Sequence, residues 1–392
     1  MTISIPYEEI HISSTEIRLD HEAGPIYLFR MFTDLAQIPS PAVLIDADAM
    51  EKNLRRMQGA CDAGGVELWP HIKTHKMIPI LHRQLELGAK GATCAKIGEA
   101  EALLPSGVRR IFIANSLADL RQAPRLKALQ TKLDQLILAV TSEPHFEALE
   151  KILSAANISV PVLMAVDTGL GREGARSLQQ AAELAANIRK CSHMQLLGLY
   201  THEGQSYGAS SMKEAGEYAA RVHAKLQEFV EAVGGNLELW PGCSVTAAIM
   251  AGRPGIKAVR PGSYVFGDLA LTETTGLMAF NEAALTILAT VVDRPEENLA
   301  LVDAGSKVFS SDKTPKGITG RCQDFPDLTV IRCNEEHGYM IGEGVNNLQI
   351  GQRLRIQPAH VCTVVNLANH VRLVRGNQIL ETWPVDARGR SD

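Results

Sequence analysis

Short apolar runs alternate with amphipathic, helix-length stretches from about residue 40 to 275, and this alternation constrains the fold most. Such a pattern predicts parallel strands joined by crossover helices. The candidate strands are 42–46, 67–72, 91–95, 110–114, 136–140, 160–167, 195–201, 237–241 and, as a weaker candidate, 257–261. Eight strands in roughly 250 residues is the size of a (β/α)₈ barrel. We therefore predict an α/β protein with a TIM-like barrel, although the count gives one strand too many. An open doubly wound sheet is the alternative, but no GxGxxG follows the first candidate strand.

The pattern changes after residue 275, where β-rich segments such as QRLRIQPAHVCTVVNL are separated by turn residues. No long helical pattern is evident among them, so we predict a second, mostly antiparallel domain. We assign residues 40–275 to the barrel, and residues 1–39 and 276–392 to this β-domain. The first 40 residues do not match the barrel pattern, and we expect them to add a strand or two to the β-domain.

Charge and cysteine content narrow the class of protein. Lysine plus arginine number 39 against 44 acidic residues, which leaves no basic surface for nucleic acid or anionic membrane. The first residues lack the pattern of a secretion signal, and the apolar runs are too short to span a membrane. Seven scattered cysteines argue against a disulfide framework. We expect a cytoplasmic protein that binds neither nucleic acid nor membrane.

Basic residues gather at the end of the second candidate strand, at His71, Lys73, His75 and Lys76. Active sites of barrels lie at the carboxyl ends of the strands. On a strand Lys73 would face the same side as His71, where its amine could form a Schiff base. A solvated basic loop, or a metal site made from His71 and His75, fits the same residues.

Two other strand ends carry residues that could line a pocket. The turn at 167–174 is rich in glycine and contains Arg172, whose guanidinium could donate to an oxyanion. Tyr200 and Tyr207 flank the next strand end. A common glycine turn and buried core tyrosines explain these residues as well.

Small residues and hydroxyls follow the last two candidate strands, in GCSVT (242–246) and RPGSY (260–264). Such a turn before a helix can hold an anion on backbone N–H groups, although an ordinary helix cap and turn would look the same. An amine at one strand end and a phosphate cradle at another is the arrangement that pyridoxal phosphate needs.

The β-domain contains His360 and Cys362, two residues apart. On a strand both side chains would project from one face. Imidazole and thiolate suit zinc, at about 2.0–2.3 Å from each ligand, with positions left open for substrate. A His-x-Cys pair also arises often by chance. The nearby cluster at 335–338 (EEHG) could be a second acid–histidine site or a charged turn.

In this order, the segments resemble the D-serine dehydratase and D-threonine aldolase family, from about residue 40 to 390. The motifs are PHIKTHK, DTGLGREG, YTHEGQSY, GCSVT, RPGSY, DAGSK, EEHG and PAHVC. The resemblance implies an alanine-racemase-like barrel with a β-domain, which is fold type III among pyridoxal phosphate enzymes. It also implies a small-molecule D-amino acid substrate and, because members are typically dimers, a homodimer.

The resemblance also implies roles for individual residues. Lys73 would carry pyridoxal phosphate as an aldimine, and Arg172 would face its phenolic oxygen. Tyr200 would lie beside the pyridine nitrogen, and Tyr207 would be a second cofactor contact. His360 and Cys362 match the family's metal pair. The implied phosphate contacts are Gly242, Cys243, Ser244, Thr246, Gly262, Ser263 and Tyr264. The run CSVT departs from the Ser-Thr-Pro-Thr type usual in the dehydratases, which leaves the exact phosphate donors open.

Dehydratases of this family usually carry His-x-Cys with zinc, whereas the aldolases usually carry His-x-Asp. Cys362 therefore favours a lyase that converts a D-3-hydroxy amino acid to a 2-oxo acid and ammonia, with Lys73 removing the α-proton. We expect a divalent metal, zinc before manganese or magnesium. Retro-aldol cleavage to glycine and an aldehyde, racemisation, and a non-catalytic pyridoxal-phosphate-binding protein remain alternatives.

Overall fold

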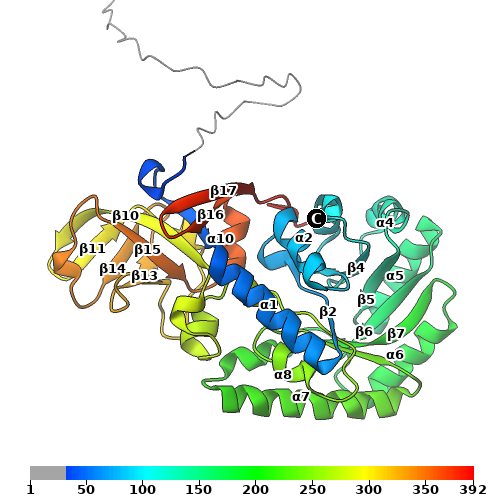
Figure 1. Cartoon of the computed structure of the whole chain (residues 1–392). Coiled ribbons are helices and arrows are strands. Elements are labelled where there is room, and N and C mark those ends of the chain that lie inside the picture. The colour runs from blue at the N-terminus through cyan, green and yellow to red at the C-terminus, as the bar shows by residue number, and fades with distance from the viewer. Residues whose placement is uncertain (1–31) are drawn as a thin grey trace, which may run out of the picture. The chain divides into compact units, whose positions relative to one another are not determined.

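The computed structural model describes residues 32–392 (Figure 1). The strands expected in the first 40 residues fall mostly outside this range. Of the described part, Asp34 forms an antiparallel bridge to Gln378 in the last strand, β17 (Gln378–Pro384). No helix within residues 32–392 is long and apolar enough to cross a membrane.

Six parallel strands form one sheet in the order in which they occur along the chain. They are β3 (Ala92–Cys94), β4 (Arg110–Ile113), β5 (Gln135–Val140), β6 (Val160–Ala165), β7 (Met194–Thr201) and β8 (Glu238–Pro241). Their residues are mostly apolar and buried, as expected when helices cover one face and a packed interior covers the other. Helices α4 to α7 lie along the outside of these strands (Figure 1).

Three of those helices, α5 to α7, begin at a capping serine, as at Ser142, whose hydroxyl accepts the His145 N–H. The helices of the barrel part are α1 (Ala47–Gly64), α2 (Ile78–Leu87), α3 (Ile97–Leu103), α4 (Ala123–Gln130), α5 (Glu143–Ala156), α6 (Leu178–Lys190), α7 (Met212–Val233) and α8 (Ala247–Ala251).

Two short strands stand apart from the six. Strands β2 (Glu67–Leu68) and β9 (Ala258–Val259) pair in parallel with each other. They join the larger sheet through single bridges, one between His71 and Thr93 and one between Leu239 and Ile256. The prediction of a full eight-stranded barrel is therefore wrong: the continuous ladder covers six strands. Pro70 contributes to the interruption, because proline has no N–H to donate.

The first candidate strand lies in the other sheet, which corrects its predicted place. Strand β1 (Ala42–Asp46) pairs antiparallel with β10 (Leu285–Glu296) and parallel with β16 (His370–Arg375). This accounts for the surplus strand. A run that is apolar throughout identifies a buried strand but not the strand's partner. The domain boundaries at residues 40 and 275 stay a prediction.

The β-rich part is a nine-stranded sheet, antiparallel except at the β1–β16 pair. Strand β10 pairs with both β11 and β15, so six of its strands close into an antiparallel barrel, and β1, β16 and β17 extend from β10. The remaining strands are β11 (Leu299–Val302), β12 (Gly320–Cys322), β13 (Thr329–Cys333), β14 (Gly338–Ile341) and β15 (Arg353–Pro358); the helices are α9 (Ser306–Phe309) and α10 (Val361–Leu367).

Aromatic side chains fill the space enclosed by the parallel strands. The rings of Trp69 and Trp240 lie 4.7 Å apart, and Phe112 meets Trp240 edge-on at 6.0 Å. All three side chains are fully buried. The interior is thus a packed core, and the cavities lined by the polar motifs lie at the strand ends.

Candidate active site

Lys73 lies in a single 3-10 turn, η2 (Ile72–Thr74), just after β2. His71 caps this turn, since its Nδ1 accepts the Lys73 N–H at 3.4 Å. Lys73 and His71 line a cavity of about 150 Å³ and an adjoining one of about 80 Å³. His202 and Arg260 also line both cavities. Lys73 therefore lines cavity space at the carboxyl end of the strands.

Hydroxyl groups from two turns form one wall of the larger cavity. The Ser244 hydroxyl accepts the N–H groups of Gly262 at 3.1 Å and Tyr264 at 3.3 Å, so it joins the turn after β8 to the turn after β9. The Ser263 and Tyr207 hydroxyls lie 3.1 Å apart. A Cβ on Gly262 would lie 2.6 Å from Thr74 Oγ1, so only glycine allows this close approach.

Three predicted phosphate contacts have other hydrogen-bond partners in the structure. The buried Glu203 carboxylate accepts the Gly242 N–H at 3.0 Å and the Thr246 hydroxyl at 2.8 Å. Burial raises the pKa of this carboxyl group despite those bonds. The Tyr264 hydroxyl accepts from the Gln84 side chain at 2.9 Å inside the core. Gly242, Cys243, Ser244, Gly262 and Ser263 do line the larger cavity.

Arg172 and Tyr200 line the smaller cavity. The Arg172 guanidinium is half-exposed and donates to Glu173 at 3.0 Å. The Tyr200 hydroxyl donates to the Ala114 carbonyl at 3.2 Å, and burial raises the pKa of this phenol, so it remains neutral. The structure thus brings both residues to the same cavity as Lys73.

Arg260 is a buried cation between the two cavities. It is 4% exposed and donates to the carbonyls of Thr201 at 2.6 Å and Trp240 at 3.2 Å. Its guanidinium carbon lies 5.2 Å from the centre of the Tyr200 ring. Burial lowers the pKa of Arg260, but a guanidinium keeps its proton in proteins. Together with Lys73 and Arg172, Arg260 makes the cavities attractive to an anion.

Two histidines beside Lys73 are neutral at pH 7. Burial, followed by the charges of Lys73 and Arg260, lowers the pKa of His71 well below its usual value. Burial lowers the pKa of His202 to about 4. His202 Nδ1 hydrogen-bonds the Gly242 carbonyl at 2.5 Å, and because a carbonyl only accepts, Nδ1 carries the hydrogen. His202 Nε2 is then a proton acceptor.

His360 and Cys362 line the larger cavity with Lys73. They do not lie on a strand, as the spacing had suggested: His360 precedes α10 as its cap residue, and Cys362 is in its first turn. Burial would raise the pKa of the Cys362 thiol, but the neighbouring His360 cation outweighs it and lowers the pKa. The Cys362 thiolate in turn raises the pKa of His360, against burial. The pair therefore favours the thiolate that a metal requires.

The donors fit the two groups that the sequence implied. A cavity with an amine at one wall, serine hydroxyls at another and three cationic side chains suits a phosphorylated aldehyde. His360 and Cys362 suit a divalent metal with ligand positions left open. Residues 335–337 of the EEHG cluster form an exposed bend before β14, and Glu336 pairs with Lys307, so the cluster matches the charged-turn alternative.

The predicted set lacked His202, Glu203, Arg260 and Asp268. His202, Glu203 and Arg260 lie within the motifs YTHEGQSY and RPGSY, and Asp268 follows RPGSY by four residues. A motif alone does not show which of its residues will face a cavity. Arg260 and Asp268 are fully or almost fully buried charges, and burial became visible only with the fold.

A family model described as "Alanine racemase, N-terminal domain" matches residues 45–270, which is more than half of the chain. The chain belongs to this family. A second model, "Putative serine dehydratase domain", matches residues 284–374. These matches confirm the resemblance seen in the motifs.

This chain is similar over most of its length to several named proteins. It is 30% identical to D-threonine aldolase of Arthrobacter sp, over 91% of this chain and 94% of that protein. It is also 30% identical to D-threo-3-hydroxyaspartate dehydratase of Delftia sp. (strain HT23), over 89% of this chain and 97% of that protein. A solved D-threonine aldolase from Filomicrobium marinum superposes with a TM-score of 0.85 at 28% identity, covering 92% of this chain and 98% of that one.

Proposed function

We propose that this protein is a lyase that uses pyridoxal phosphate and a divalent metal to dehydrate a D-3-hydroxy amino acid, yielding a 2-oxo acid and ammonia. One observation carries the proposal: the Lys73 amine and the His360–Cys362 pair line the same cavity. Relatives named as dehydratases and aldolases of 3-hydroxylated D-amino acids support it. We further propose that the protein is a homodimer and is located in the cytoplasm. We also keep the domain limits expected from the sequence, with residues 40–275 in the parallel-strand domain and residues 1–39 and 276–392 in the β-domain.

In this proposal Lys73 holds the cofactor, and the Ser244, Ser263 and Tyr207 hydroxyls bind its phosphate. Gly242, Cys243 and Gly262 line the same wall, where their small size leaves room for the phosphate. Thr246 and Tyr264 support that wall from behind through Glu203 and Gln84. Arg172, Tyr200 and Arg260 bound the space for the ring. Pyridoxal phosphate, when bound, accepts the electron pair left on the α-carbon after deprotonation.

The chain's own groups handle the proton. With the cofactor bound, the Lys73 amine would be the base that takes the substrate's α-proton. His71 and His202 are neutral at pH 7, because burial lowers the pKa of each. Neither histidine therefore adds a positive charge beside Lys73. His202 Nε2 is a second acceptor at the cavity, available to relay a proton to solvent.

His360 and Cys362 would hold the metal, and the thiolate favours zinc over manganese or magnesium. A divalent metal supplies a Lewis acid for the β-hydroxyl, a poor leaving group on its own. Asp268 keeps the His360 hydrogen on Nδ1. A variant of D-threo-3-hydroxyaspartate dehydratase has been solved in a metal-free form, which supports a metal in that protein.

Retro-aldol cleavage is the second candidate. It is favoured by the 30% identity to the Arthrobacter aldolase and by the TM-score of 0.85 to the Filomicrobium enzyme. Cys362 favours dehydration, because the aldolases of the resembled family usually carry aspartate at that position. Both reactions use the same cavity and differ in which bond at the β-carbon breaks.

The test uses purified protein incubated with pyridoxal phosphate and then reduced with borohydride. Peptide mass mapping should place a phosphopyridoxyl group on Lys73. Unreduced enzyme is then given D-serine, D-threo-3-hydroxyaspartate or D-threonine, with the L-isomers as controls, before and after treatment with a chelator. We expect 2-oxo acid and ammonia that depend on the metal.

Glycine plus an aldehyde in place of those products would establish the aldolase. Modification of another lysine, or of none, would overturn the cofactor assignment. Turnover that a chelator leaves unchanged, in protein shown to be free of metal, would remove the metal from the proposal.

A further inference from the structure

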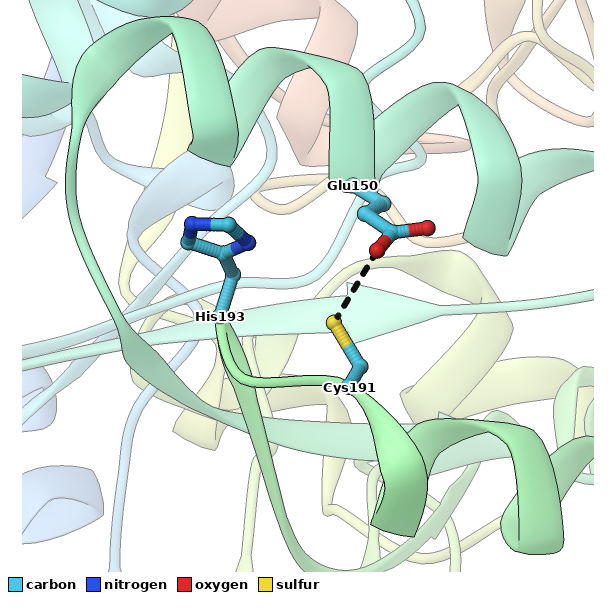
Figure 2. A group of neighbouring side chains, drawn as sticks. All are labelled: Glu150, Cys191 and His193. Atoms are coloured by element: carbon cyan, nitrogen blue, oxygen red, sulfur yellow. Dashed lines mark hydrogen bonds between the residues drawn. The ribbon is translucent and has the colours of Figure 1, made fainter.

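A second group of metal-ligating side chains lies at the opposite end of the parallel strands from the candidate active site. It comprises Glu150 on α5 and Cys191 and His193 in the turn between α6 and β7 (Figure 2). His193 directly precedes the first residue of β7, whereas the active-site residues follow the carboxyl ends of the strands. None of the three residues belongs to a motif of the active site.

The three side chains converge on one point. Figure 2 shows the imidazole, thiol and carboxylate directed toward a common space between α5 and the turn. One ligand atom from each residue lies within 4.8 Å of the other two, and Cys191 Sγ is 3.7 Å from Glu150 Oε1. Around tetrahedral zinc, sulfur and oxygen ligands are expected about 3.5 Å apart, and nitrogen and oxygen about 3.3 Å. Any two of the ligand atoms therefore need to approach each other by at most about 1.5 Å.

His193 offers a donor that the protein itself does not use. Its Nδ1 is buried and has no hydrogen-bond partner within residues 32–392. A buried polar atom without a partner is costly and calls for an explanation such as an ion. The Cys191 thiol, by contrast, is directed at the Glu150 carboxylate, and exchange of its proton for a metal would leave all three groups coordinated.

We propose that Glu150, Cys191 and His193 form a second metal site, selective for a borderline-soft divalent cation such as zinc. One thiolate, one imidazole and one carboxylate make a ligand set that suits zinc and disfavours magnesium and calcium. The three ligands have a total charge of −2, which neutralises the cation. A fourth position remains for water.

Backbone hydrogen bonds hold the turn that carries Cys191 and His193 in place. We assign the site a structural role, in which the bound metal stabilises the folded chain. The Cys191 N–H ends α6 by donating to the Ile188 carbonyl, and the His193 carbonyl accepts the Val160 N–H at the start of β6. A metal bound here would tie α5 to the turn that starts β7. Because it binds the folded chain, it raises the midpoint of thermal unfolding. Because this site lies at the opposite end of the strands from the candidate active site, we expect metal binding here to leave turnover unchanged.

The experiment counts metal in full-length protein stripped by chelator and titrated with zinc. A His360→Ala/Cys362→Ala background removes the other proposed site, so the result does not depend on the proposed function. This background should still bind one equivalent of zinc and, with cobalt, show thiolate charge-transfer absorption. Loss of a group that merely hydrogen-bonds a metal ligand lowers metal affinity about 10–100-fold. Removing a ligand itself, by Cys191→Ser or His193→Gln in this background, should therefore lower the zinc affinity by more than about 100-fold.

Cys333→Ser is the matched control, since Cys333 is also a half-buried free thiol. We expect it to keep the zinc equivalent, the cobalt band and the zinc-dependent rise in thermal midpoint. The proposal is overturned if the background variant binds no zinc, or if its zinc binding survives both Cys191→Ser and His193→Gln. Equal loss in Cys333→Ser would overturn it as well.

Discussion

His360 is held by Asp268: its Nδ1 lies 2.9 Å from the Asp268 carboxylate, and Asp268 is fully buried. Because a carboxylate only accepts, Nδ1 of His360 keeps its hydrogen toward Asp268, and Nε2 is the atom that would bind a metal after releasing its proton. Backbone N–H groups of Val361 and Leu271, each at 3.3 Å, anchor the same carboxylate. The contact joins the segment after β9 to the start of α10.

Asp268→Asn should weaken metal binding about 10–100-fold, the usual effect of losing the carboxylate partner of a ligating histidine. The amide cannot hold the hydrogen on Nδ1 as strongly, so the imidazole loses its preferred tautomer. Metal affinity by competition with a chelator measures this directly. The exposed Asp327→Asn is the control. Unchanged affinity in folded Asp268→Asn protein would contradict a positioning role.

Lys73→Ala should abolish covalent attachment of pyridoxal phosphate and lower kcat by at least about 10²–10⁴-fold, the range of a lost general base. The measurement combines mass mapping after borohydride reduction with turnover of D-3-hydroxy amino acids. Lys90→Ala, at an exposed lysine, should retain both properties. Equal loss in the two variants would show that the effect is not specific to Lys73.

Glu282→Gln should lower stability at pH 7 by about 1 kcal/mol, a scale typical of exposed ion pairs. Lys52 first, then the Ala279 N–H and Arg56, lower the pKa of Glu282 to about 2 from a usual value of 4.5. The unfolded chain therefore binds more protons between these values, so the stabilisation is present above about pH 4.5 and is lost as pH falls toward 2.

Urea unfolding of both proteins between pH 7 and pH 2.5 tests this dependence. The difference between them should shrink across that interval. Glu228→Gln, at an exposed position of α7, should follow the wild type at every pH. A constant difference would mean that charge at Glu282 is not responsible.

Trp240→Ala should cost about 3–5 kcal/mol, as expected for removing a large aromatic side chain from a core. Trp240 packs against Trp69 and Phe112 and is 1% exposed. Urea unfolding gives the free energy. Trp383→Ala, in the more exposed strand β17, should cost clearly less. Similar costs at both positions would argue against a packed barrel interior.

Local sequence patterns predicted much of the fold because each acts within one segment. The apolar runs identified β3 to β8 as buried strands. Partners are decided by contacts across the chain, which explains the errors. Strand β1 has the same apolar composition as a barrel strand, yet it pairs with β10 and β16. Similarly, β2 and β9 join the larger sheet by single bridges only.

The candidate site shows the same division. Lys73, Arg172, Tyr200, His360 and Cys362 were identified from motifs, and the structure brings all of them to two adjoining cavities. Motifs did not reveal that Glu203 takes the donors of Gly242 and Thr246, because a short segment does not specify which buried acid will fold against it.

The sequence by itself determined the order of strands and helices, the change to a β-rich second part and the reactive side chains at strand ends. These depend on local periodicity and on residue chemistry. Tertiary structure alone decided the six-stranded ladder, the contact of His360 with Asp268, and the meeting of Glu150 with Cys191 and His193. Those residues are 41 to 92 positions apart, and only packing of the whole chain brings such distant groups within bonding distance.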